Sequence, residues 1–286
     1  MSFRSVLLFI SIILLGLTAC TKKELITVPD NEAPLVNHVP RIKIERYVNR
    51  VFIDLLGREP IIEEMEAEVA ALKAAQLSKE ARTTLVVKLQ TATHFVVGDT
   101  SYQRAYYQNL YNLAKIRCLE GASDAKIGEF GGPGDLGASA RAVLATRNDL
   151  QQGTIQMHEA FARMIDNPVY DLINMNSFNF VNATFDNLLW RFPTSSEFNA
   201  GFNMVEHQRQ KRLFGQSGRN KTDYIQILTE SREMFGGLLI WSFQKLLSRR
   251  PTSLESDQML DDFFQHQDIR LVQRQIMIGD EYANFE

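Results

Sequence analysis

The chain has 286 residues, of which 45% are hydrophobic and 23% are charged, and its formal net charge at pH 7 is −3. The hydrophobic content is ample for a buried core, whereas the mildly acidic balance gives no electrostatic case for binding nucleic acid. The two cysteines, Cys20 and Cys118, match neither a zinc-binding pair nor a haem-attachment motif, so no metal and no cofactor is predicted.

Residues 1–19 have the pattern of a secretory signal peptide. Arg4 supplies a positive start, and the apolar run at 6–17 is too short to span a bilayer. The sequence Leu-Thr-Ala-Cys at 17–20 resembles the bacterial lipobox, in which the chain is cut before the cysteine and its sulfur receives a diacylglycerol. We therefore expect Cys20 to be the lipid attachment site. The alternative is an ordinary signal peptide with an incidental cysteine.

The residues after Cys20 bear on the location of the protein. In the proteobacterial sorting rule, aspartate after the cysteine retains a lipoprotein in the inner membrane; here Thr21 follows, so the rule favours the outer membrane. Either its periplasmic face or the cell surface is compatible with this sequence. Residues 20–40 contain three prolines and little periodicity, which predicts a flexible tether in front of a body at 41–286.

The first half of the body has the apolar spacing of helices. Helices are predicted at 42–56, 64–75, 78–93 and 102–119. No segment alternates with a period of two between turn signals, so no sheet is predicted. The inward-facing residues expected from the spacing include Ile44, Tyr47, Val48, Val51, Phe52 and Leu55 in the first helix, and Tyr106, Leu110, Leu113 and Ile116 in the fourth.

Residues 121–137 interrupt the helical pattern. This segment is rich in glycine but lacks the lysine and the preceding strand of a phosphate-binding loop. We predict a long mobile loop, at which the body could be subdivided. Long loops in compact domains are often functional, so a partner could bind here.

Helices are next predicted at 139–150, 154–165 and 169–190. The last has an apolar stripe and five asparagines, which are mediocre helix formers, so a break is expected near Asn176 and Ser177. The asparagines either cap helices and face solvent or line a binding groove. The stripe consists of Phe178, Val181, Phe185, Leu188, Leu189 and Phe192, and the asparagines are Asn174, Asn176, Asn179, Asn182 and Asn187.

The remaining residues contain a basic segment and the most apolar stretch of the body. A helix is expected to reach His207, and a central buried helix is expected within 222–247, where Gly236 and Gly237 permit close packing or a kink. Final helices are predicted at 256–264 and 269–278. The basic segment either forms a solvated loop or contacts an anionic partner, such as lipopolysaccharide phosphates or an acidic protein face. Its cations are Arg209, Lys211, Arg212, Arg219 and Lys221.

One motif, F-x-x-L-L-x-R-x-P-x-x-x-E, begins at Phe52, Phe185 and Phe243. Its Phe and Leu residues form an apolar helical stripe. Its Arg falls in the last helical turn, where it can bond free carbonyls, and its Pro stops the helix. In the second and third copies, Thr and Glu form a capping box that opens a new helix. The predicted structural corners comprise Arg58, Pro60, Glu64, Arg191, Pro193, Thr194, Glu197, Arg249, Pro251, Thr252 and Glu255.

Two short stretches carry family resemblances. Residues 47–60, with 84–89 and 106–115, resemble the helical domain that accompanies cytochrome c modules in planctomycetes. The Leu-Leu-Gly-Arg-x-Pro phrase at 55–60, together with 278–282, resembles extracellular helical domains related to phycobilisome linkers. Both resemblances imply a helical fold. The chain lacks a haem-binding C-x-x-C-H motif, so neither electron transfer nor any catalytic residue carries over.

The sequence therefore predicts an all-α body of Pro-cornered helical hairpins and no enzyme. It contains no metalloprotease motif, since His158-Glu159 lacks a second histidine, and no nucleophile elbow. The favoured function is a lipid-anchored scaffold or binding module for another envelope protein. One alternative is a lipoprotein that binds glycan or another small ligand through Trp190, Trp241 or Tyr107. The other is an envelope hydrolase with a carboxylate pair.

Overall fold

The structure, a computed structural model, describes residues 39–94 and 100–285. The predicted signal peptide, Cys20 and most of the predicted tether lie outside the described residues. The described body is all-α, as predicted. Val39–Glu286 forms one compact unit, and none of its described helices is both long and apolar enough to cross a membrane.

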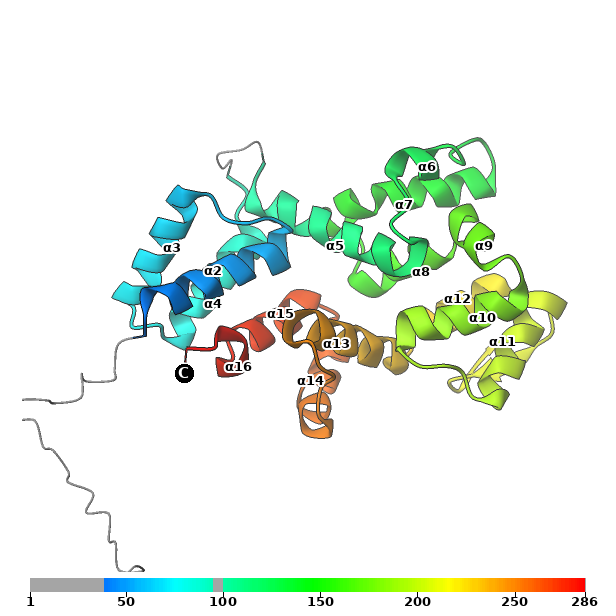
Figure 1. Ribbon diagram of the computed structural model, residues 1–286. Helices are drawn as coiled ribbons and strands as arrows, with labels where there is room; N and C mark the ends of the chain where they lie inside the picture. Colours follow the sequence, from blue (N-terminus) through cyan, green and yellow to red (C-terminus); the bar gives the residue numbers. More distant parts are fainter. Residues whose placement is uncertain (1–38, 95–99, 286) are drawn as a thin grey trace, which may run out of the picture. The chain divides into compact units, whose positions relative to one another are not determined.

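Polar residues cap many of the helices, which follow one another from blue to red in Figure 1. Ser78, Ser101, Asn167 and Ser231 each accept a hydrogen bond from a backbone N–H of the helix that follows. In chain order the elements are α2 (Arg41–Leu56), α3 (Ile62–Ala74), α4 (Lys79–Thr91), α5 (Tyr102–Leu119), α6 (Asp124–Gly128), α7 (Asp135–Gln152), α8 (Met157–Ile165), α9 (Pro168–Asn174), α10 (Ser177–Thr184), the π-helical turn η2 (Phe185–Leu189), α11 (Ser195–His207), β1 (Lys211–Leu213), β2 (Gln216–Gly218), α12 (Lys221–Thr229), α13 (Arg232–Leu247), α14 (Ser253–His266), α15 (Ile269–Met277) and α16 (Asp280–Ala283).

The core is continuous through the described body. Helix α5 packs on α2, α4, α7 and α8, and α13 packs on η2, α14 and α15. All six inward-facing residues predicted for α2 are buried. The central buried helix predicted within 222–247 is α13, although Ser231 separates it from α12. Gly237 permits a close approach, because a Cβ there would lie 1.9 Å from the carbonyl oxygen of Leu188.

Three predicted inward-facing positions are wrong, since Ile116, Phe178 and Phe192 are 62%, 58% and 73% exposed. Successive residues of an α-helix differ by about 100°, so repeated steps of three residues drift around α5 until Ile116 lies opposite its buried face. Phe178 is in the first turn of α10, where its ring contacts Phe198. Phe192 follows the end of η2 and is therefore outside the stripe.

The prediction of no sheet is also wrong, because β1 and β2 form a small antiparallel hairpin with Leu213 opposite Gln216. Phe214 and Gly215 join the strands with φ angles of 48° and 81°. Two left-handed loop residues are typical of the type I′ turn that matches the twist of paired strands. Strands of three residues are too short to show an alternating pattern.

Residues 121–137 are not the continuous loop that was predicted. Ser123 caps α6, and Gly134, with a φ of 86°, precedes α7. The Arg141 Nη1 atom donates hydrogen bonds to the Gly131 and Gly132 carbonyls at 2.7 and 2.5 Å. The segment therefore holds a helical turn between α5 and α7, which pack against each other.

Candidate functional site

The three copies of the motif form corners of the same construction. Each first helix ends at a residue with positive φ: Gly57 at 70°, and Trp190 and Ser248 at 56°. The arginine of each corner lies over the phenylalanine six residues earlier, with 5.2–5.5 Å between guanidinium carbon and ring centroid. Both of its terminal nitrogens also bond the glutamate six residues later, at 2.7–2.9 Å. These ion pairs are Arg58–Glu64, Arg191–Glu197 and Arg249–Glu255.

The role of the arginine differs from the prediction. It was expected to bond free carbonyls in the last turn of the first helix. Among the described residues, the only backbone carbonyl that it bonds is that of the residue that follows it. Its main partner is the glutamate that opens the second helix. The arginine therefore joins both arms of a corner, because it contacts an aromatic ring on one and a carboxylate on the other.

The predicted capping boxes are present in the second and third corners. Thr194 and Glu197 exchange hydrogen bonds through their side chains and backbone N–H groups, and so do Thr252 and Glu255. In the first corner Ile61 stands in the place of threonine, so only one of the two hydrogen bonds of a capping box forms. The Ile61 N–H donates to the Glu64 carboxylate at 2.9 Å. Glu64 also accepts a hydrogen bond from the Tyr102 hydroxyl at 2.9 Å.

The environment of the corner carboxylates favours their ionised form. The hydrogen bond from Arg191 is the largest cause that lowers the pKa of Glu197 to about 2, and the one from Arg249 does the same for Glu255. Burial raises the pKa of Glu64, but the hydrogen bonds from Arg58, the Ile61 N–H and Tyr102 together lower it by more. Each of these carboxylates binds an arginine and a backbone N–H at the start of the second helix. These contacts indicate a structural role for the three glutamates.

The second and third corners contact each other. Arg250 donates a 2.8 Å hydrogen bond to the Trp190 carbonyl, and η2 packs on α13. The first corner instead contacts α5, where Asn109 donates to the Asp54 and Leu55 carbonyls at the end of α2. The corners are thus fixed points of the core.

The predicted basic segment forms the β1–β2 hairpin and its flanks. Lys221 is half-buried and bonds Asp171 at 2.6 and 2.9 Å, so it is not a free cation. The other four cations are exposed and make no ion pair with the described part of the chain. We call these four residues the basic hairpin: Arg209, Lys211, Arg212 and Arg219.

The aromatic residues considered for glycan binding offer little open surface. Trp241 and Tyr107 are each only 7% exposed. The guanidinium of Arg117 lies 3.9 Å from the centroid of the half-buried Trp190 ring and covers one of its faces. Trp241 and Tyr107 therefore offer no open platform for a saccharide ring, and Trp190 has one covered face.

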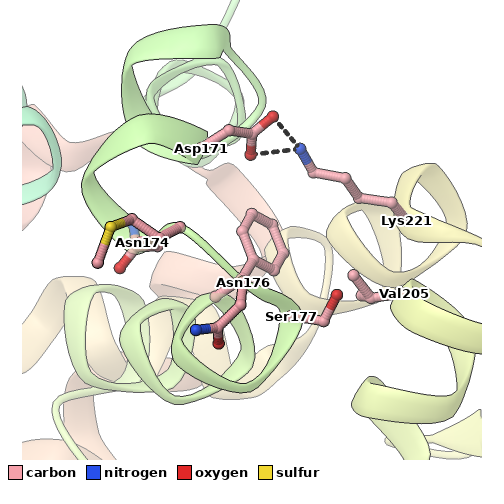
Figure 2. Close-up of a pocket in the computed structure, with 8 residues that line it drawn as sticks. Asp171, Asn174, Asn176, Ser177, Val205 and Lys221 are labelled. Atoms are coloured by element: carbon pink, nitrogen blue, oxygen red, sulfur yellow. Dashed lines mark hydrogen bonds and ion pairs between the residues drawn. The ribbon is translucent and has the colours of Figure 1, made fainter.

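A pocket of about 270 Å³ lies where α9, α10, α11 and α12 meet (Figure 2). One side is formed by the ion pair between Asp171 and Lys221, whose Nζ lies 4.8 Å from the Phe180 ring centroid. We call it the Asp171–Lys221 pocket. Its lining residues are Asp171, Asn174, Met175, Asn176, Ser177, Phe180, Val205 and Lys221.

The asparagines of this region cap helices, as one of the two alternatives predicted, and two of them also line a pocket. Asn176 caps α10 at the predicted break, accepting from the Asn179 N–H at 2.9 Å, and Asn182 donates to the Phe178 carbonyl. Asn174 and Asn176 also line the pocket. Sequence reasoning missed Asp171, because its partner Lys221 is 50 residues away and no local pattern joins them.

Two carboxylates lie near Lys221, but their arrangement differs from a hydrolytic pair. Asp166 lies 3.9 Å and Asp171 2.6 Å from the Lys221 Nζ. Burial raises the pKa of Asp166. A glycosidase needs two carboxyl groups facing one cleft, whereas Lys221 contacts both carboxylates here and Asp166 is not among the lining residues. The three charges form an ion-pair cluster.

The other titratable candidates belong to the core. Cys118 is buried, and burial raises the pKa of its thiol. His158 is buried against Phe235, and burial lowers the pKa of its imidazole. Among residues 39–94 and 100–285, no three His, Cys, Asp or Glu side chains are grouped so that they could hold a metal ion.

Comparisons with protein-family models, curated proteins and solved structures gave no match. The two family resemblances therefore stay predictions from short stretches of sequence.

Proposed function

We propose that this chain is a lipid-anchored cell-envelope protein that acts as a scaffold or binding module for another envelope component. In this proposal Cys20 carries the lipid, residues 20–40 tether the body, and the basic hairpin binds an acidic face of a partner protein at the outer membrane. The observation that carries the proposal is the group of four exposed cations, whose side chains make no ion pair within the described residues of a chain with net charge −3.

Charge and rigidity support this surface. The hairpin pairs with itself, packs on α11 and α12, and is anchored by the buried Leu213. Complementary charge on a partner steers encounter and fixes orientation. At each corner an arginine binds a glutamate through both of its terminal nitrogens, and this ion pair joins two successive helices. Such corners suit a scaffold, because they hold a binding surface in place.

Reversing the four charges of the basic hairpin to glutamate is expected to lower recovery of the crosslinked partner from whole cells by at least about tenfold. Four exposed ion pairs of roughly 0.5 kcal/mol each amount to about 2 kcal/mol, and 1.4 kcal/mol is a factor of ten. The measurement is quantitative mass spectrometry after crosslinking and solubilisation.

A matched control carries four glutamates at other exposed cations that make no ion pair with the described residues. Its recovery should equal that of the wild type, since the net charge changes equally but the hairpin is intact. If both variants, or neither, lose the partner, the hairpin is not the binding surface. If the wild type returns no neighbour, the scaffold proposal fails. The control positions are Arg46, Lys73, Lys79 and Arg104.

Cys20→Ser is expected to move the protein from the membrane fraction to the soluble fraction. Without the cysteine sulfur no diacylglycerol can be attached, and lipid chains provide the stable anchoring. The measurement is fractionation followed by a carbonate wash. A variant that still sediments with washed membranes would refute lipid anchoring.

A further inference from the structure

We propose that the Asp171–Lys221 pocket binds an uncharged saccharide of one or two rings. The site is distinct from the basic hairpin and does not depend on the proposed partner. It combines a neutral ion pair, accessible amide groups and apolar side chains in one concavity of about 270 Å³ (Figure 2).

The charges around the pocket select against an ionic ligand. The Lys221 ammonium is bound by both oxygens of Asp171, and Asp166 lies 3.9 Å from the same nitrogen. Glu206 adds a further negative charge beside the pocket, where it accepts a hydrogen bond from Ser177 at 2.5 Å. An anion would meet three carboxylates and no free cation, and a cation would have to displace Lys221. A neutral ligand meets neither cost.

The lining supplies donors and acceptors together. The Asn176 side-chain oxygen caps α10, which leaves its NH₂ group without a partner among the described residues. Asn174 donates to the Tyr170 carbonyl at 2.9 Å, and its own side-chain oxygen has no partner among the described residues. Asp171 retains lone pairs beside those used by Lys221. A sugar hydroxyl both donates and accepts, so adjacent hydroxyls can accept from an amide and donate to a carboxylate.

Apolar groups complete the lining. Phe180 is 4% exposed, Val205 is partly buried, and Met175 is 80% exposed. Met175 is the C-cap of α9 and has a φ of 49°, the left-handed conformation in which many helices end. This conformation places Asn174 and Asn176, on either side of it, in the same lining. The volume is just below the roughly 300 Å³ at which pockets for drug-sized ligands begin, which suits one or two sugar rings.

Asn176→Ser tests the site without removing the helix cap, since serine and asparagine cap helices about equally well. The full chain is held in a sugar-free detergent, and binding of chitobiose and maltose is measured by calorimetry and ligand-observed NMR. The wild type should bind at least one of them at millimolar concentration, but neither glucuronate nor glucosamine. Asn176→Ser should weaken binding about tenfold, the equivalent of one lost hydrogen bond.

The matched control is Asn220→Ser, which changes another asparagine cap, at the start of α12, that does not line the pocket. It should bind as the wild type does. Asp171→Asn removes the carboxylate that binds the Lys221 ammonium through both oxygens, so this variant should discriminate less against glucuronate than the wild type does. The proposal is overturned if neither disaccharide binds, if Asn176→Ser and Asn220→Ser bind equally, or if the wild type prefers a charged sugar. These outcomes leave the crosslinking result for the basic hairpin unaffected.

Discussion

Replacing Gly237 with alanine should destabilise the protein by at least about 3 kcal/mol, the upper part of the range for overpacked cores. The new Cβ would lie 1.9 Å from the carbonyl oxygen of Leu188, 2.9 Å from its carbonyl carbon and 3.1 Å from the Cα of Leu189. All three atoms belong to the backbone, so no side chain can rotate to make room. Either α13 or the π-helical turn must move, and the packing between them is lost.

Thermal unfolding measures this effect, with an expected fall in melting temperature of roughly 6–12 °C for a body of this size. The adjacent Gly236 provides the control, because a Cβ there meets nothing within 4 Å. Gly236→Ala should be stabilising by up to about 1 kcal/mol, the difference in helix propensity between the two residues. If both alanine variants unfold at the wild-type temperature, the contact between α13 and Leu188 is absent.

Glu64→Gln should cost about 2–3 kcal/mol, which is less than for a fully buried pair because the Arg58 side chain is 34% exposed. Glu64 is 8% exposed and accepts hydrogen bonds from Arg58, the Ile61 N–H and Tyr102. Glutamine keeps the shape but loses the charge, and its NH₂ group faces an arginine donor. Chemical denaturation at neutral pH gives the difference in free energy of unfolding.

The ion pair of the third corner, Arg249–Glu255, is expected to stabilise the fold less than the pair of the first corner does. Glu255 is more exposed, and its arginine also binds Glu281 at 2.5 Å. Glu255→Gln should therefore cost no more than about 1 kcal/mol, the range for exposed ion pairs. Equal losses for the two variants would contradict the view that burial and the Tyr102 hydrogen bond make the first corner the strongest.

The pH dependence gives an independent check. The folded-state pKa of Glu64 is lowered below its usual value, so its ionised form stabilises the fold above the unfolded-state pKa, and this stabilisation is lost as the pH falls. The difference between wild type and Glu64→Gln should be full at neutral pH and shrink below about pH 4. Glu197 and Glu255, with pKa values of about 2, should keep part of their contribution to lower pH. A difference that is constant from neutral to acid pH would exclude a charge-based role for Glu64.

Local partners explain why the corners could be predicted from the sequence. Each arginine contacts a phenylalanine six residues before it and a glutamate six residues after it. These contacts depend on backbone geometry within a single turn, so the order of residue types almost fixes them. Even here the partner of the arginine was predicted incorrectly. The helix carbonyls and the glutamate compete for the guanidinium group, and residue spacing alone does not show which of them it binds.

The sequence by itself determined the helical class, most of the longer helices and the corners, because period, caps and prolines act within a few residues of the chain. Only the tertiary structure decided that Ile116 of α5 is exposed, that Gly237 meets Leu188, and that Asp171 and Lys221 form one wall of a pocket. Those pairs lie 49 and 50 residues apart. Contacts over such separations depend on how whole helices pack against one another. The spacing of residues along one helix does not show which face of another helix packs against it.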